Sequence, residues 1–295
     1  MIQLFFQLER LSDGTLNHRA RVNICDLGRY RLQRKNYVMV ALTDEKSTIT
    51  KALVLGDSGT GKTGALASLV GAGYKLRVLD LDNKLQTGIL PQVLKRDHPD
   101  KMRNIDYEAV RDRFKASALG PVFDGMPKSF TRSLELLDKW SDGTIPAKWG
   151  PDYIFVLDSL TFFSDSAYNW AKSLNPGVKD PRQWFYTAQQ AVENTIAMLT
   201  ADSFQTNVLV LAHVNWQNRP DGTCKGYPSA VGQALGPTIP AYFDSMILCQ
   251  TGAGNKRTIQ TVPTALVDLK HPSFGIAPTL PLETGLATFF EALRK

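Results

Sequence analysis

A glycine-rich octet holds the side chains best suited to chemistry in this chain. It follows an apolar run and reads Gly56-Asp57-Ser58-Gly59-Thr60-Gly61-Lys62-Thr63. Glycines let a backbone curl so that its N–H groups face an anion, and the N-terminus of a following helix favours negative charge. In such a P-loop Lys62 reaches the β- and γ-phosphates of ATP, and the Thr63 hydroxyl binds Mg²⁺. A chance glycine-rich turn is the alternative, but the complete motif with its strand and helix favours the P-loop.

A second magnesium ligand is expected at the end of a buried strand near the P-loop. Tyr153–Leu157 is an apolar run typical of a central parallel strand, and Asp158 follows it directly. Outside a nucleotide site, an aspartate in this place would be only a turn or helix cap. Given the P-loop, we interpret Asp158 as the carboxylate that holds Mg²⁺ together with Thr63.

Hydrolysis of ATP also needs a carboxylate that orients the attacking water. Asp80 and Asp82 close a third apolar run, and strand alternation would place them on the same side. Asp82 is nearer the carboxyl end, where α/β sheets bind ligands, so it is the candidate, although either could instead cap the next turn. His213 follows a fourth run and is either a γ-phosphate contact or an ordinary strand-end histidine.

These side chains can meet only if the apolar runs before them are neighbouring strands of one sheet. Runs over residues 52–55, 76–81, 153–157 and 207–211 alternate with segments long enough for crossover helices, the first over Gly64–Val70. Beyond Asp244 we expect short antiparallel strands and a closing helix, near Met246–Cys249, Thr258–Val262, Ala265–Leu269 and Leu286–Leu293. The prediction is an α/β fold with a mostly parallel central sheet, helices on both faces and antiparallel C-terminal edge strands.

The composition suits one large α/β domain. The chain has 295 residues, of which 43% are hydrophobic. No apolar run approaches the roughly 18 residues that a membrane span needs, so we expect a cytoplasmic protein without a membrane partner. The three cysteines are far apart and form no metal-ligand spacing, which favours reduced structural thiols. Residues 83–150 include a helix-like piece, Ser133–Trp140, but no chemistry that we can name.

The positive charge is concentrated at one end of the chain. Residues 1–38 hold seven basic and three acidic side chains, and so account for +4 of the net +6. We interpret them as a basic N-terminal extension ahead of an ATPase domain over residues 39–295. A poorly ordered extension, an arm that touches DNA and an over-long gene start before Met39 all remain open. The rest of the chain is nearly neutral, which is weak evidence for a DNA partner.

The order of these motifs resembles the RecA family, and most closely the small phage RecA-like ATPases of single-strand annealing and recombination. The resemblance covers about residues 47–295. It is based on the motifs above, on a helix near Gln189–Leu199 and on Val231–Leu235. It implies that Asp82 is the catalytic carboxylate and that His213 senses the γ-phosphate. The chain departs from the bacterial recombinase at both positions, with Asp for Glu and His for Gln, and the shorter Asp could slow hydrolysis.

The resemblance also implies groups outside the nucleotide site. Lys270 corresponds to one of two basic residues that a neighbouring subunit places against ATP, although it could equally be a surface lysine. The two DNA-binding loops of the family correspond to residues 171–185 and 215–231. The second loop has the aromatic and basic side chains that single strands require, although its two aromatic rings could instead pack on the core: Trp216, Arg219, Lys225 and Tyr227.

These observations predict an ATP- and Mg²⁺-dependent ATPase that acts on single-stranded DNA in phage-type recombination, annealing or replication. A ring or filament of identical subunits is expected, and a single-strand DNA-binding protein is a conceivable partner. In a phage the site of action would be the host cell cytoplasm. Two alternatives remain: a motor ATPase such as a helicase, and a regulatory module in which ATP controls protein association without DNA.

Overall fold

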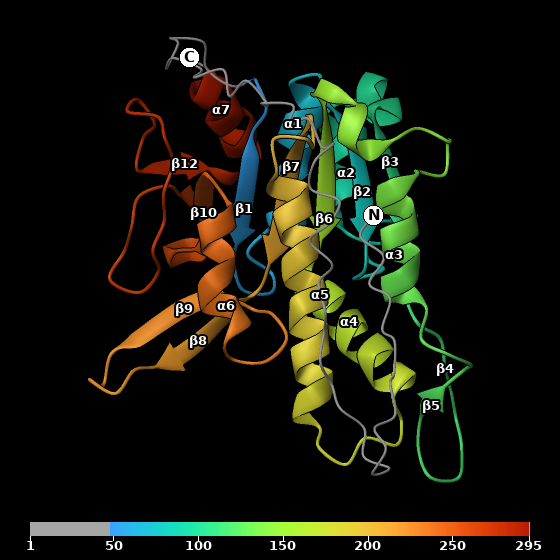
Figure 1. Cartoon of the computed structure of the whole chain (residues 1–295). Helices are drawn as coiled ribbons and strands as arrows, with labels where there is room; N and C mark the ends of the chain where they lie inside the picture. Colours follow the sequence, from blue (N-terminus) through green and yellow to red (C-terminus); the bar gives the residue numbers. More distant parts are fainter. Residues whose placement is uncertain (1–47, 295) are drawn as a thin grey trace, which may run out of the picture. The chain divides into compact units, whose positions relative to one another are not determined.

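The computed structural model describes residues 48–294, so the extension predicted over residues 1–38 and its boundary with the ATPase domain lie outside the described residues. An eight-stranded sheet has the order β12-β11-β10-β1-β7-β6-β2-β3 (Figure 1). The six strands from β10 to β3 are parallel, and β11 pairs in antiparallel fashion with both β10 and β12. The strands of this sheet are β1 (Lys51–Leu55), β2 (Lys75–Asp80), β3 (Ile105–Ala109), β6 (Gly150–Asp158), β7 (Thr206–Ala212), β10 (Ser245–Thr251), β11 (Arg257–Gln260) and β12 (Thr279–Pro281).

Helices and short segments fill the connections between these strands. The α-helices are α1 (Lys62–Gly71), α2 (Ile89–Asp97), α3 (Ser129–Asp138), α4 (Leu160–Leu174), α5 (Arg182–Thr200), α6 (Leu235–Thr238) and α7 (Leu282–Arg294). Two separate hairpins consist of β4 (Phe114–Lys115) with β5 (Val122–Phe123) and β8 (Val214–Asn218) with β9 (Cys224–Pro228). Short 3₁₀ helices are η2 (Pro99–Asn104), η3 (Pro146–Lys148), η4 (Ile239–Tyr242) and η5 (Ala253–Asn255).

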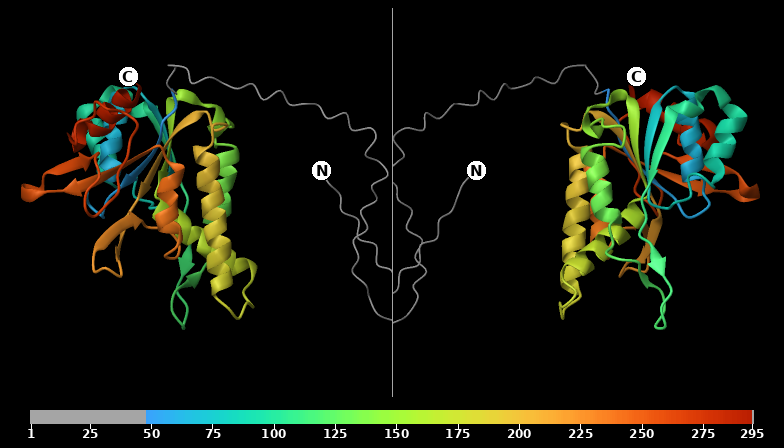
Figure 2. Two further views of the ribbon diagram at one scale, coloured as in Figure 1. Left: turned by 60° about the vertical axis from the view of Figure 1, so that its left-hand side comes forward. Right: turned by 90° about the vertical axis from the view of Figure 1, so that its right-hand side faces the viewer.

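Two hydrophobic cores lie on opposite faces of the sheet. Side chains alternate along a strand, so Leu53 and Leu55 of β1 belong to one core, whereas Ala52 and Val54 belong to the other. The first core is covered by α3, α4 and α5, and the second by α1, α2 and α7 (Figure 2). Because both faces are covered, the central strands are almost continuously apolar, which is why the sequence revealed them. The predicted α/β class, with helices on both faces and antiparallel edge strands, is confirmed.

The C-terminal part of the prediction needs two corrections. The strand expected near Met246–Cys249 is not an antiparallel edge strand, because β10 pairs in parallel with β1. Residues 265–269 form no strand, although Val267 and Leu269 are buried in the first core. Their alternating pattern comes from a loop packed on the core, and Lys270 alone forms an antiparallel bridge to Met246. The strand expected over Thr258–Val262 is present as β11 and is antiparallel.

Three segments extend from the carboxyl edge of the sheet. The β4–β5 hairpin follows β3, the turn between α4 and α5 follows β6 through α4, and the β8–β9 hairpin follows β7. Figures 1 and 2 show all three extending from the same end of the domain. Within residues 48–294, no helix combines the length and apolar character needed to cross a membrane.

Candidate nucleotide-binding site

The glycine-rich octet forms a loop between β1 and the first turn of α1. Gly59 and Gly61 have φ angles of 83° and 95°, in the left-handed region that favours glycine. A Cβ on Gly61 would lie 2.4 Å from the Leu282 Cδ2 atom, so a side chain there would displace Leu282 as well as strain the backbone. The loop thus leads directly into a helix N-terminus, the arrangement that binds phosphate.

Lys62 lies buried at the start of α1. Its ammonium group donates hydrogen bonds to the carbonyl oxygens of Gly56 at 2.7 Å and Asp57 at 3.1 Å. Burial lowers the pKa of Lys62, and the negative charges of Asp158, Asp82 and Asp57 oppose this shift. The lysine is therefore held within the curve of the loop, where a phosphate chain would meet its charge.

Thr63 and Asp158 meet next to the P-loop. The Thr63 hydroxyl donates a hydrogen bond of 2.8 Å to the Asp158 Oδ2 atom. Burial, reinforced by the neighbouring Asp82 charge, raises the pKa of Asp158 to about 7. Such a carboxylate gains most from a nearby cation, and hydroxyl and carboxylate oxygens are ligands that Mg²⁺ prefers. The two oxygens therefore fit a magnesium ion that would also bind the phosphates.

Asp80 and Asp82 have different surroundings, although alternation predicted a common side. β2 ends at Asp80, so the period of two does not extend to Asp82. The buried Asp80 accepts hydrogen bonds from the backbone N–H groups of Asn83 at 2.8 Å and Leu85 at 2.9 Å, and so closes the turn after β2. The half-buried Asp82 instead accepts a bond of 3.2 Å from the Ser159 hydroxyl and lies close enough to raise the pKa of Asp158.

His213 connects the end of β7 with the β8–β9 hairpin. Its backbone N–H donates to the Thr161 hydroxyl at 3.2 Å, and its carbonyl accepts from the Ser229 N–H at 2.8 Å. The Thr161 hydroxyl is also 3.3 Å from the Ser229 carbonyl oxygen. Burial and the Lys62 charge lower the pKa of the imidazole, which places His213 within electrostatic reach of the P-loop.

Lys270 does not approach the P-loop of its own chain. It is exposed, and its backbone pairs with Met246 at the start of β10. The P-loop follows the other end of the β1–β10 pair, where Leu55 is level with Leu248. Any contact between Lys270 and a nucleotide would therefore involve a second subunit.

The residues proposed for DNA contact lie on the β8–β9 hairpin. Trp216 is 42% exposed, and Arg219 donates a hydrogen bond of 2.9 Å to the Tyr227 hydroxyl. Lys225 forms an ion pair with Asp268. The other predicted loop, residues 171–185, consists of the end of α4, a turn and the start of α5.

Sequence reasoning missed the groups that the C-terminal region places against the P-loop. A Cβ on Gly61 would lie 3.2 Å from the Arg257 Cδ atom, and one on Gly56 would lie 2.7 Å from the Cys249 carbonyl oxygen. Arg257 is exposed beside the loop at the start of β11. It belongs to no motif and is about 200 positions from the octet, so no local signal could have identified it.

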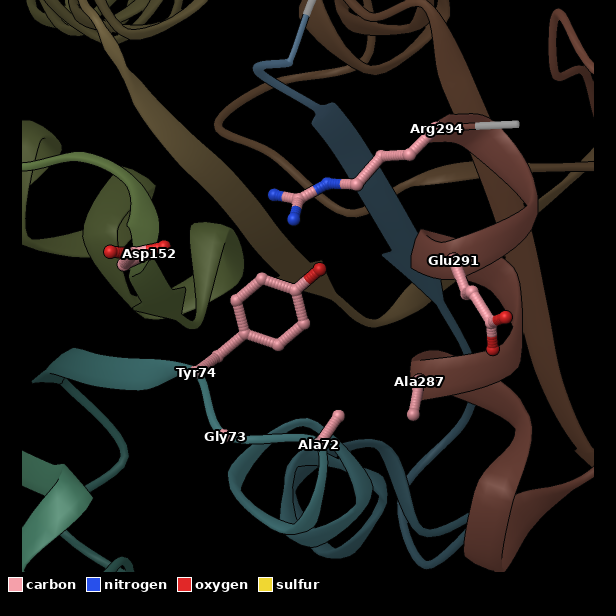
Figure 3. Close-up of a pocket in the computed structure, with 7 residues that line it drawn as sticks. All are labelled: Ala72, Gly73, Tyr74, Asp152, Ala287, Glu291 and Arg294. Carbon is pink, nitrogen blue, oxygen red and sulfur yellow. The ribbon is translucent and has the colours of Figure 1, made fainter.

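A separate cavity lies at the amino edge of the sheet, where Tyr74 precedes β2 and Asp152 lies near the start of β6 (Figure 3). The Arg294 guanidinium of α7 stacks over the Tyr74 ring at 4.9 Å and donates to the Pro151 carbonyl oxygen at 3.0 Å. These contacts fasten α7 to the sheet at the edge opposite the P-loop. The cavity is therefore distinct from the nucleotide site.

Comparisons with known proteins give a family match and similarities to solved structures. A solved structure described as the RadB recombinase matches with a TM-score of 0.45 and 15% identity, over 81% of this chain and 90% of that one. An ATPase from the type III secretion system of pathogenic bacteria matches with a TM-score of 0.39 and 10% identity, over 68% of this chain and 51% of that one. No curated protein sequence gives a significant match. Residues 48–273, which contain the P-loop, Asp158 and His213, match the family model described as an AAA domain, and the chain belongs to this family of P-loop ATPases.

Proposed function

We propose that this ATPase binds ATP with Mg²⁺ and uses hydrolysis to control its hold on single-stranded DNA, in recombination, annealing or replication of the phage type. The observation that carries this proposal is the path of β7. The Ala212 carbonyl oxygen at its end accepts a hydrogen bond of 3.2 Å from the Gly56 N–H of the P-loop. The next residue is His213, and the chain then enters the β8–β9 hairpin. A change at the γ-phosphate would thus reach the hairpin through one residue.

The chemistry follows from the positions of the charged groups. Lys62 and the backbone N–H groups of the P-loop bind the phosphates, and Thr63 and Asp158 would hold Mg²⁺. The ion would neutralise charge that develops on the phosphoryl oxygens. Asp82 orients and polarises the attacking water, because its carboxylate lies beside Ser159 and near Asp158. His213 contacts the γ-phosphate and transmits its presence through the Ser229 N–H bond to the hairpin.

The hairpin supplies two kinds of contact for a single strand. Trp216 presents an exposed ring on which a base can stack, and Arg219 presents a guanidinium beside the Tyr227 ring. Lys225 is already paired with Asp268, so its contribution requires exchange of that partner for a phosphate. The stacking groups should therefore contribute more than Lys225.

The active form is an oligomer if Lys270 completes the site of a neighbouring subunit. Lys62→Ala and Lys270→Ala should each lack turnover alone. A mixture should regain part of it, because the Lys62→Ala subunit still supplies Lys270 to the intact P-loop of its neighbour. A mixture with no more activity than its components would exclude this role for Lys270.

The decisive experiment measures steady-state ATP hydrolysis with and without single-stranded DNA, with Lys62→Ala as the blank. Stimulation by DNA should be lost in Trp216→Ala with Arg219→Ala, whereas turnover without DNA should remain. Arg96→Ala, which removes an exposed arginine on α2, is the control for loss of positive charge. Turnover that is indifferent to DNA would favour a regulatory ATPase, and unwinding of duplex DNA would favour a helicase.

A further inference from the structure

The β4–β5 hairpin exposes large apolar side chains. Phe114 is 57% exposed, Leu119 is 99% exposed and Met126 is 63% exposed. The Phe114 ring lies against the Phe123 ring, with centroids 4.6 Å apart and planes inclined by 32°. Exposed apolar surface of this kind marks an interaction site. The paired rings form a platform at the carboxyl edge of the sheet, beyond β3.

A cavity with basic walls lies at the base of this hairpin. Its lining includes four basic residues, Arg111, Arg113, Lys128 and Arg132. Its acidic residues have intramolecular partners: Asp112 accepts the N–H groups of Lys128 and Ser129, Asp124 pairs with Lys115, and Glu108 accepts from Ser141. Within residues 48–294, Arg113 and Lys128 form no ion pair. The lining thus holds four basic and three acidic side chains, and Arg132 pairs with Glu135, whereas Arg113 and Lys128 remain available to an anion.

Ser129 adds a hydroxyl group to the same cavity. It is the first residue of α3, a helix of ten residues, and it lines the cavity although it is only 5% exposed. Its Oγ atom has no hydrogen-bond partner in the part of the chain that the structure describes. A buried hydroxyl without a partner is costly, whereas the backbone N–H groups at the start of α3 already donate to Asp112. A phosphate oxygen would satisfy the hydroxyl.

The cavity lies in line with the other projecting segments of the carboxyl edge. In the sheet order β7-β6-β2-β3, the β8–β9 hairpin follows the carboxyl end of β7 and the β4–β5 hairpin follows the carboxyl end of β3, three strands away. Three strand spacings correspond to roughly 14 Å. Arg111 connects the two regions, because it donates a hydrogen bond of 3.4 Å to the Asp82 carbonyl oxygen.

We infer that the β4–β5 hairpin and the basic cavity at its base form a second contact for single-stranded nucleic acid, in which a base stacks on Phe114 and a backbone phosphate binds Arg113, Lys128 and Ser129. This inference rests on the proposed function, because it extends the same strand beyond the β8–β9 hairpin. Aromatic rings beside unpaired cations are the combination that single strands require. A protein partner would need the apolar side chains but not the basic side chains that would bind a phosphate.

The test measures binding of a fluorescent oligothymidylate by anisotropy in the presence of ATP and Mg²⁺. Phe114→Leu keeps an apolar side chain against Phe123 but loses the stacking surface, so the affinity should fall about 5- to 100-fold. Phe114→Trp should bind at least as well as the wild type. Arg113→Gln should reduce the slope of log affinity against log salt by about 0.7, because one phosphate contact is lost.

Phe274→Ala is the matched control, since Phe274 is a fully exposed phenylalanine outside the three projecting segments. Wild-type affinity in Phe114→Leu, with strong binding by the unmodified protein, would overturn this inference and leave the proposed function intact. A wild type that binds no single strand would remove both. A change in sedimentation without a change in DNA affinity would assign the hairpin to contacts between subunits and would also overturn the inference.

Discussion

The assignment of Asp82 as the catalytic carboxylate and Asp80 as a structural residue gives a sharp prediction. Replacement of each by Asn preserves shape and removes charge, but the two replacements should affect different quantities. Asp80 is buried, and both of its oxygens accept backbone N–H groups, from Asn83 and Leu85. An Asn in its place sets an NH₂ group against one of these donors, so one buried N–H loses its acceptor.

The magnitudes separate the two roles. An unsatisfied buried donor costs about 1–3 kcal/mol, and burial raises the pKa of Asp80, so loss of the charge recovers part of this cost. Asp80→Asn should thus lower the free energy of unfolding by about 1–2 kcal/mol, or roughly 2–8 °C in melting temperature. Asp82→Asn loses only its bond to Ser159, so its melting temperature should stay near the wild type. Its kcat should fall about 100- to 10,000-fold, because a general base supplies that factor.

The assay combines thermal unfolding, equilibrium binding of ATP and steady-state hydrolysis on the same preparations. Asp82→Asn should bind ATP at least as tightly as the wild type, since a negative charge near the phosphates is removed. Hydrolysis by Asp80→Asn should persist below its melting temperature. An Asp82→Asn protein with normal turnover, together with a stable but inactive Asp80→Asn protein, would refute the assignment.

Three further predictions concern the fold and the loop. Phe290→Ala should lower the free energy of unfolding by about 3–5 kcal/mol in chemical denaturation, because Phe290 is fully buried between α7 and the sheet and leaves a cavity. Gly61→Ala should weaken ATP binding in equilibrium titration, since the alanine would adopt a left-handed φ of 95° and its Cβ would displace a Leu282 atom 2.4 Å away; normal affinity would contradict the geometry of the loop. Without nucleotide and metal, burial raises the pKa of Asp158 from its ordinary value of 3.8 to about 7, so the folded state holds an extra proton between these pH values. The stabilisation that protonated Asp158 gives the folded state is fully present below about pH 4 and is lost as the pH rises through 7. Asp158→Asn should therefore remove this pH dependence from the melting temperature.

The sequence was most informative where the relevant residues are contiguous. The conformation of the octet can be predicted from its own residues, since glycines, lysine and threonine at this spacing are typical of a loop between strand and helix. Asp158 could be proposed as the metal-binding carboxylate because it ends a long apolar run, the pattern of a strand that is covered on both faces. The same reasoning found β1, β2, β6 and β7 and hence the parallel sheet.

Weaker patterns misled the prediction or gave none. The predicted direction of β10 was wrong because a short apolar run does not indicate which neighbouring strand it will pair with. β3 was missed because an edge strand is only partly buried and lacks an apolar run. Residues 83–150 offered no motif, since Phe114 and Phe123 become a platform only when a hairpin brings their rings together.

The sequence by itself determined that this chain has a P-loop and a parallel sheet to hold it, because these features depend on local spacing and hydrophobic pattern. Tertiary structure decided the different hydrogen-bond partners of Asp80 and Asp82, the position of Arg257 and Leu282 beside Gly61, and the segments that share the carboxyl edge. Those outcomes depend on contacts between residues far apart in the chain, and such contacts form only when the helices pack on both faces of the assembled sheet.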